Sequence, residues 1–409
     1  QAELWLGGLD PNSLAAFNTG AILSAVDSQG REQGRVQLER REGLVGKAKL
    51  LDRVPPGALL QERSRNIPPN LALKIGLDPS LSSDAGTAKQ AITAIPRMEA
   101  LPLQTQEVHY IFGRMTSAYL QQLQSVRAPK LPEVGSLGLF TPALEVIPDS
   151  FGMSGETVKN AIARLHSKLN SLLAAHIIKT ALNTNSSRLK VVASMQVEGG
   201  GKVIADPFTT RGGSLGKQTS PISATPTISP DSRKLPLRTP VQILVTNNEP
   251  NDLYFSVLVI DPTGEMSVVF PNHWTAAEEV TLVKAGEIKE IPNPKTDNFR
   301  LVTQEPKGVA EVLILASRTP LRKGLKTLRD IVATRSDTTR GGPVTLETSP
   351  EQNEAGEVID NLLDDFTSST RGSVRNSTRS SDSISESATS DRSIETNQLA
   401  ALSITFEVI

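Results

Sequence analysis

The chain has 409 residues, a formal net charge of −1 and no cysteine, and only 4% of its residues are aromatic. This length predicts two or three domains. The balanced charge provides no global basic field that would indicate nucleic-acid binding, and so few aromatic residues are poorly suited to stacking bases. Without cysteine, these residues can form no disulfide, no thiolate metal site and no thiolate nucleophile. We therefore expect no nucleic-acid partner and no cysteine chemistry from this chain.

Hydropathy along the chain bears on its location. No stretch approaches the roughly 18 consecutive apolar residues of a membrane-spanning helix, so no membrane span is predicted. No signal-peptide pattern follows Gln1, and we expect a cytoplasmic location by default. A glutamine at the first position indicates a chain that has been processed, trimmed or cut from a longer gene product.

Residues 1–205 are predicted to form a mixed α/β region. Alternating or continuous apolar residues at 36–38, 71–77 and 108–113 predict strands. Residues 79–95 are rich in alanine, lysine and glutamine and predict a helix between two of these strands. A strand, a helix and a strand at this spacing indicate a small α/β unit.

An amphipathic helix is the clearest element of this region. Ser154 is a candidate N-cap. Apolar residues then recur in steps of three and four on one stripe, at Val158, Ile162, Leu165, Leu169 and Leu172. Polar residues at 183–187 end the helix, and returning strands are predicted at 188–192 and 195–197.

The second half of the chain is predicted to be a β-sandwich domain, residues 234–333, after a Ser/Thr/Pro/Gly linker at 206–233. Its strands alternate with turns, of which Asp261-Pro262-Thr263-Gly264 is the clearest. A helix that begins at Thr319 and Pro320 closes the domain.

Residues 334–398 predict a disordered Ser-rich loop, because they contain too few apolar residues to offset the entropy of ordering. Residues 399–409 alternate as a C-terminal strand that returns to one of the sheets. The predicted fold class is therefore α+β, with a mixed α/β region followed by a β-sandwich that has a C-terminal helix and strand.

The candidate catalytic motifs lack the surrounding sequence that their chemistry requires. Ser214 lies in a G-x-S-x-G string, 212–216, but neither a strand before it nor a helix after it is predicted, which favours a linker. The four histidines include no H-E-x-x-H motif and no close metal-ligand pair. His176 continues the apolar stripe of its helix and is predicted to be a hydrogen-bonded core histidine. No catalytic residue, cofactor site or metal site is predicted.

His273 and Trp274 are the candidate ligand-binding residues. They lie in a predicted loop after a strand, where side chains are free to contact a ligand. The alternative is a polar loop with one packed tryptophan.

Several segments together resemble a known family. Residues 4–9 (LWLGGL), 41–48 (REGLVGKA), 67–71 (IPPNL) and 77–81 (LDPSL) are similar to the region that follows the protease domain in cyanobacterial caspase-family proteins, the orthocaspases. The segments 158–161 and 185–189 resemble the helix and strand that close that region. Residues 253–255, 261–264, 285–287 and 404–406 resemble the uncharacterised β-sandwich domain that ends many of these proteins.

The resemblance implies a role beside a cysteine endopeptidase that cuts after basic residues with a His–Cys dyad. Nothing in this chain matches that catalytic domain. We therefore expect an accessory region for recognition or regulation, inactive by its own residues, which docks a caspase-like protease domain in cis or in trans. The alternative is a free-standing β-sandwich binding module for a glycan, a peptide or an envelope component. A serine hydrolase that uses Ser214 is a third hypothesis.

Overall fold

A computed structural model describes residues 1–7, 17, 19–29, 31–67, 71–103, 108–124, 131–183, 187–199, 203–205, 233–271, 278–297, 299–321, 325–326, 365 and 392–409. Within these ranges the chain is mostly β-strand, arranged in four sheets. None of the helices in the described part is both long and apolar enough to cross a membrane.

The N-terminal sheet is antiparallel and has the order β1-β4-β3-β2-β5-β20. Its strands are β1 (Ala2–Trp5), β2 (Ile22–Val26), β3 (Glu32–Glu42), β4 (Val45–Leu50), β5 (Leu59–Ile67) and β20 (Arg392–Glu395). Alternate residues of β3, such as Val36 and Leu38, face a small core of their own that also contains Leu4, Phe17 and Leu23.

The mixed sheet has the order β7-β6-β8-β9, in which β7 and β8 run parallel to β6 and β9 runs antiparallel to β8. Its elements are β6 (Leu73–Leu77), η1 (Pro79–Asp84), α2 (Ala85–Thr93), β7 (Met98–Pro102), β8 (Tyr110–Arg114), α3 (Ser117–Gln124) and β9 (Leu137–Phe140). Helix α2 is the crossover that parallel strands require, in the stretch where the sequence predicts a helix.

Helix α4 (Val158–Ala181) is the longest helix in the described part of the chain. Its N-cap is Thr157, whose side chain accepts a hydrogen bond from the backbone N–H of Asn160. The prediction of Ser154 as the cap was wrong, because the Ser154 hydroxyl donates to the carbonyl of Val134 instead. Local sequence offers two suitable cap residues three positions apart, and the packing of the preceding loop selects the second.

Two further sheets face each other across one hydrophobic core. The outer sheet has the order β11-β10-β13-β17, with β18 also paired to β13, and the inner sheet has the order β12-β21-β19-β14-β15, with β16 paired to β14. The outer strands are β10 (Val191–Val197), β11 (Val203–Ala205), β13 (Pro240–Asn247), β17 (Ile288–Ile291) and β18 (Leu301–Val302). The inner strands are β12 (Lys234–Leu235), β14 (Leu253–Ile260), β15 (Met266–Phe270), β16 (Leu282–Val283), β19 (Gly308–Ser317) and β21 (Leu399–Val408), and η3 (Glu278–Val280) precedes β16.

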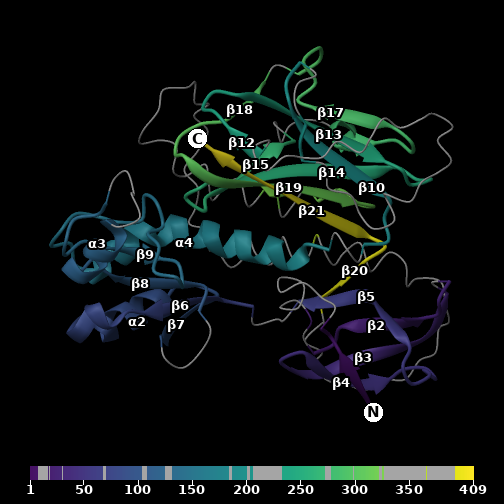
Figure 1. The fold of residues 1–409 in the computed structure, drawn as a ribbon, viewed down its shortest axis with the longest axis horizontal. Coiled ribbons are helices and arrows are strands. Elements are labelled where there is room, and N and C mark those ends of the chain that lie inside the picture. Colours follow the sequence, from purple (N-terminus) through teal and green to yellow (C-terminus); the bar gives the residue numbers. More distant parts are fainter. Residues whose placement is uncertain are drawn as a thin grey trace.

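The inner sheet is buried on both faces. In β19, Val312 and Ile314 point into the core shared with the outer sheet, whereas Leu313 and Leu315 point into the core that contains α4. Burial on both faces explains the almost continuous apolar sequence of this strand. The layers are therefore the outer sheet, the inner sheet, α4 and the mixed sheet, as Figure 1 shows.

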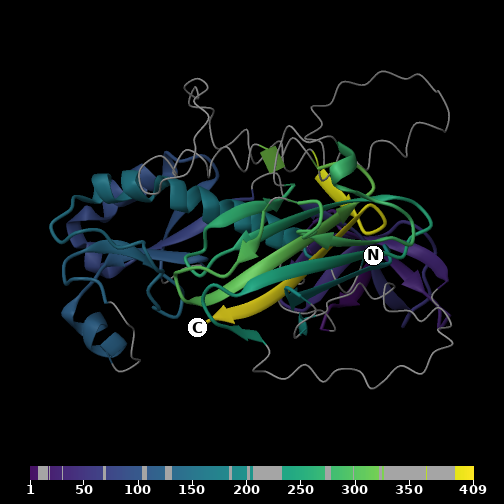
Figure 2. The ribbon, with the colours of Figure 1, turned by 90° about the horizontal axis from the view of Figure 1, so that it is seen from above.

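The C-terminal strand joins parts of the fold that are far apart in sequence (Figure 2). β21 pairs with β19 along its whole length, from Gly308 opposite Val408 to Ser317 opposite Leu399. Just before it, β20 pairs with β5 of the N-terminal sheet. The side chain of Asn183, which follows α4, donates to the carbonyl of Leu399 and accepts from the N–H of Ala401, so β21 is also fixed to the end of the helix.

The boundary predicted at residue 205 differs from the arrangement of the sheets. β10 and β11 lie in the outer sheet, where β10 pairs with β13 over seven residues from Val191 opposite Asn247 to Val197 opposite Val241. The alternation within β10 predicts a strand but contains no information about its partner. The linker predicted at 206–233, most of the helix predicted from Thr319 and most of the loop predicted at 334–398 lie outside the described residues.

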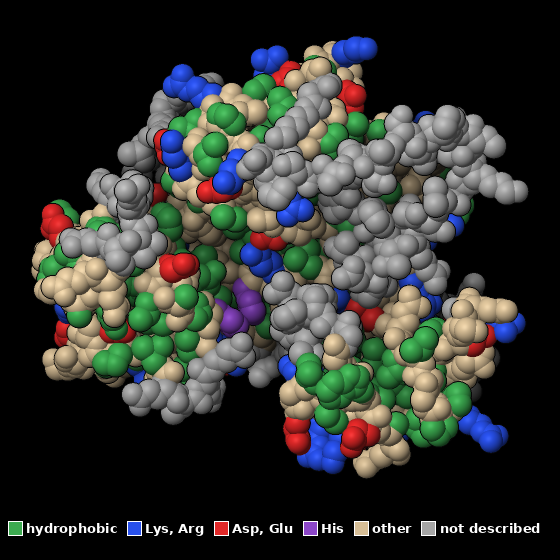
Figure 3. All heavy atoms as spheres, viewed as in Figure 1, with side chains coloured by type: hydrophobic (Ala, Val, Ile, Leu, Met, Phe, Trp, Pro, Cys, Tyr) green, Lys and Arg blue, Asp and Glu red, His purple; other side chains and the backbone are tan. Residues whose placement is uncertain are grey.

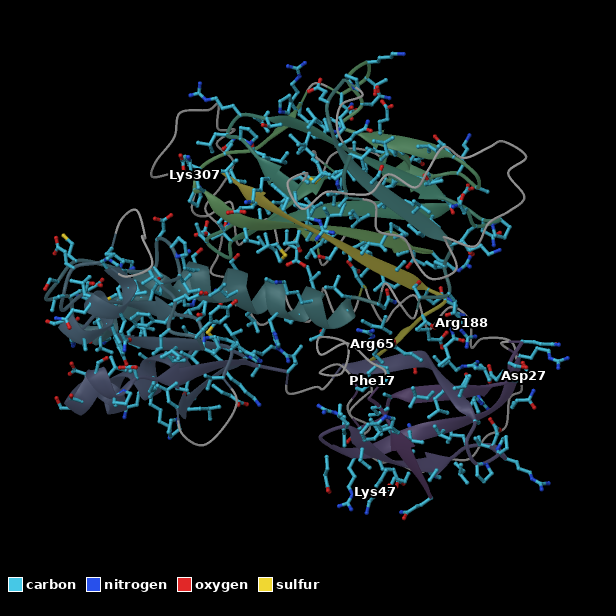
Figure 4. All side chains as sticks on the ribbon, viewed as in Figure 1. Phe17, Asp27, Lys47, Arg65, Arg188 and Lys307 are labelled. Atoms are coloured by element: carbon cyan, nitrogen blue, oxygen red, sulfur yellow. The ribbon has the colours of Figure 1, made fainter. Side chains whose placement is uncertain are left out.

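A buried ion pair connects the N-terminal sheet to α4. Arg65 of β5 donates to both carboxylate oxygens of Glu62, and its third guanidinium nitrogen donates to the carbonyl of Thr180 at 2.8 Å. Both charged side chains are 2% exposed. Figure 4 shows Arg65 between the N-terminal sheet and the C-terminal end of α4.

Replacement of Glu62 by Gln is expected to lower the free energy of unfolding by about 3 kcal/mol, because it leaves the buried Arg65 charge without its partner. Glu32→Gln is the matched control, since Glu32 pairs with Arg63 of the same sheet at 2.8 Å but both side chains are more than one-third exposed. We expect this control to cost less than about 1 kcal/mol. Equal losses for the two variants in urea unfolding would contradict the role of the buried pair.

Candidate functional site

A cavity of about 410 Å³ lies where α4, the mixed sheet and the inner sheet meet. Figure 3 shows histidine side chains in a hollow near the middle of this face of the molecule. The residues that line the cavity come from β8, α4, β19, β21 and the β14–β15 turn, and they include His109, Tyr110, His176, Lys179, Asp261 and Glu311. Its wall also contains apolar residues, among them Leu172, Ile260 and Val309. This mixture is typical of small-molecule sites.

The β14–β15 turn, Asp261 to Gly264, forms one side of the cavity. Asp261 Oδ1 accepts hydrogen bonds from the backbone N–H of Thr263, the hydroxyl of Thr263 and the backbone N–H of Glu265, at 2.7–2.9 Å. Burial raises the pKa of the Asp261 carboxyl, although these hydrogen bonds act in the opposite direction. Gly264 adopts a φ of +82°, which L side chains rarely tolerate.

The same turn is fixed to α4 by polar contacts. The ammonium of Lys168, which is fully buried, donates to the carbonyls of Thr263 and Pro148, both at 3.1 Å. The hydroxyl of Ser171 accepts the backbone N–H of Met266 at 2.7 Å. Because backbone groups of the turn bond to side chains of the helix, the two walls of the cavity are held in a fixed relation.

Two histidines from different elements meet at the cavity. The ring centroids of His109, just before β8, and His176, on α4, are 4.1 Å apart with the planes tilted by 40°. His109 Nδ1 accepts the backbone N–H of Lys74 at 3.0 Å, so the proton of the neutral His109 ring lies on Nε2. Burial, followed by the nearby His109, Lys179 and Lys74, lowers the pKa of His176 to about 4. His176 is therefore neutral near pH 7.

A charged pair lies beside the histidines. The Lys179 ammonium is 2.7 Å from a carboxylate oxygen of Glu311, and the hydroxyl of Ser403 donates to the other carboxylate oxygen at 2.5 Å. Lys179 is 47% exposed, whereas Glu311 is mostly buried. The cavity can thus offer hydrogen-bond donors and charges to a ligand. Among the described residues, no group of three or more His, Cys, Asp or Glu side chains could hold a metal ion.

The sequence indicated only part of this site. His273 and Trp274, the predicted ligand-binding residues, lie outside the described residues, and so does Ser214. His176 was predicted to be a core histidine, whereas it is partly buried, contacts His109 and lines the cavity. The one available signal was its polar ring on an otherwise apolar helical stripe. The pairing with His109 could not be found, because it depends on the docking of α4 against β8.

One family model matches part of the chain. Residues 234–320 match the family model described as Domain of unknown function (DUF4384). This range extends from β12 to just beyond β19, so it lacks β10 and β11 of the outer sheet and β21 of the inner sheet. No curated protein and no solved structure matches the chain.

Acid is expected to destabilise the protein partly through His176. Its folded pKa, about 4, lies below the unfolded value of about 6.5, so the unfolded state binds more protons between these pH values and stability falls as the pH falls. His176→Gln should reduce the loss of unfolding free energy between about pH 7 and about pH 4 by about 2 kcal/mol. His166→Gln, on an exposed position of the same helix, is the control variant, and an equal change in its pH profile of urea unfolding would contradict the role of His176.

Gly264→Ala is expected to destabilise the turn in two ways, through its positive φ and through a clash of the new Cβ with Leu172 Cδ2, which would be 2.5 Å away. Gly286→Ala separates these effects, because Gly286 has a φ of +75° but nothing within 4 Å of its added Cβ. We expect about 1 kcal/mol for the control and about 2–3 kcal/mol for Gly264→Ala. Equal costs in thermal unfolding would show that the turn does not pack tightly on α4.

Proposed function

We propose that this chain is a non-catalytic recognition and regulatory region that acts with a caspase-like cysteine protease, docking its catalytic domain in cis or in trans. The link to a protease rests on the resemblance of segments such as 41–48 and 261–264 to the region that follows the catalytic domain in orthocaspases. The chain has no cysteine, so the thiolate of such an enzyme would come from outside these residues.

The observation that carries a recognition role is the position of the cavity. It lies between the domain of unknown function, which supplies the β14–β15 turn and Glu311, and the α4–β8 part of the chain, which supplies His109 and His176. A ligand in the cavity would contact both parts at once. Binding there would therefore favour the docked arrangement of the two, which is a physical route from recognition to regulation.

The second candidate is a free-standing β-sandwich binding module for a glycan, a peptide or an envelope component, in an α+β chain. The facing inner and outer sheets and the cavity support this alternative. Of the aromatic residues on β14 and β15, Phe255 and Phe270 are buried and only Tyr254 is partly exposed, so these two strands present no cluster of exposed aromatic rings for a sugar. In the cavity, a glycan or peptide would find polar side chains for hydrogen bonding.

The isolated chain is expected to show no hydrolysis of peptide substrates with Arg or Lys before the cleaved bond, since it has no thiolate to attack them. The assay is fluorogenic peptide turnover by the purified chain. Activity that a thiol reagent abolishes would reveal a contaminant. Activity that persists with the reagent but disappears in Ser214→Ala would contradict this proposal and would indicate a serine hydrolase.

The association with a protease is tested on the native protein. We expect mass spectrometry of the protein isolated from its own cells to find an intact mass above 43.9 kDa, with upstream peptides that contain His and Cys, or to find a caspase-like protease that co-purifies. A native mass near 43.9 kDa without a co-purifying protease would contradict the proposal. It would leave the free-standing binding module as the better explanation.

A further inference from the structure

We propose that the junction cavity binds a small oxyanion, a phosphate or a carboxylate group, between His109, His176 and Lys179, and that His176 takes up a proton when the anion binds. The inference deepens the proposed recognition role by naming the ligand class. It depends on the cavity and its side chains and not on the association with a protease.

The first support is the convergence of basic groups from separate elements. His109 comes from the start of β8, and His176 and Lys179 lie one turn apart on α4, so the two helical side chains project from the same face. The two imidazole rings are in contact, at 4.1 Å between centroids. Two rings and an ammonium around one cavity form a set of donors that matches the oxygen atoms of an anion.

The second support is the sign of the local field. Two ammonium groups, those of Lys179 and Lys74, and the neighbouring His109 ring each disfavour protonation of His176. An anion in the cavity would counteract this repulsion and would favour the imidazolium. A neutral ligand would leave the repulsion in place.

Acidic and hydroxyl groups also face the cavity and have to be taken into account. The titratable and charged side chains around His176 are His109 just before β8, Tyr110 from β8, Lys74 from β6, Lys179 from α4, Glu311 from β19 and Asp261 from the β14–β15 turn. Asp261 Oδ1 accepts three hydrogen bonds within its own turn, and Glu311 accepts one from Ser403 and pairs with Lys179. The negative charges at the cavity are thus partly neutralised by their own contacts.

Lys179 can contact Glu311 and a bound anion at the same time. Its ammonium carries three N–H donors, and its side chain is 47% exposed, so contact with Glu311 on one side leaves other directions open. The buried apolar side chains of Leu172 and Ile260 form part of the wall and lower the local dielectric, which strengthens electrostatic interactions beside them. A cavity of about 410 Å³ is large enough for a small metabolite that carries the anionic group.

Proton uptake by His176 makes the affinity for the anion depend on pH. His176 is neutral in the empty cavity until the pH approaches about 4, whereas the bound anion raises its pKa. For an anion of constant charge, proton uptake by His176 therefore increases the affinity as the pH falls from the bound pKa toward the free one, by up to about tenfold for each pH unit.

The experiment follows the four histidine rings by NMR in the full chain, with and without inorganic phosphate at constant ionic strength, between about pH 7 and about pH 3.5 so that the midpoint of the free His176 ring is included. We expect phosphate to shift the signals of His109 and His176, to raise the titration midpoint of His176 by about one pH unit or more, and to bind more tightly at the lower pH. A second arm uses citrate, and a response to citrate alone supports the inference with a carboxylate as the ligand group.

Three variants make the result specific. His176→Gln and Lys179→Gln should each weaken binding at least about tenfold, and the exposed position of Lys179 makes loss of the fold an unsatisfactory explanation for its effect. His166→Gln, on the exposed side of α4, should bind as the original chain does. The inference is overturned if neither anion shifts the two rings, if His166 responds as strongly as His176, or if affinity does not change with pH.

Discussion

The burial of helix α4 between two sheets is the constraint on which the rest of the structure depends. The helix buries residues around most of its circumference, because the mixed sheet covers one side and the inner sheet the other. Each fully buried Leu or Ile contributes about 1.5–3 kcal/mol. Without α4, apolar residues of the inner sheet such as Leu313 and Leu315 would face water, so this sheet needs a partner from outside the matched family range.

Polar contacts determine the position of α4 between the mixed sheet and the inner sheet. The Lys168 side chain is fully buried, and its ammonium donates hydrogen bonds to two carbonyl groups, one of them in the β14–β15 turn. Such a buried ammonium is tolerated only where acceptors are fixed in place, and it penalises any other register of the helix on the sheet. At the far end, Asn183 fixes β21 and Arg65 fixes the N-terminal sheet. These hydrogen bonds fix the elements that line the cavity and therefore determine where it lies.

The cavity is therefore a property of the assembled chain and not of any single segment. His109 and His176 come from one side, and Asp261 and Glu311 come from the range that matches the family model on the other. A group that binds between them gains contacts that exist only when the two sides are docked. Binding of such a group and the stability of the docked state would be linked by mass action.

The sequence by itself determined the local elements and what this chain cannot do. The apolar stripe from Val158 to Leu172 predicted α4, the Asp261–Gly264 turn followed from its residue types, and the lack of cysteine excluded a thiolate mechanism. These conclusions rest on periodicity and side-chain chemistry over a few neighbouring residues. The partners of the strands, the choice of Thr157 as the cap and the contact of His109 with His176 were decided only by the tertiary structure. Such pairings depend on which surfaces bury each other, and residues far apart in sequence carry no local signal of that choice.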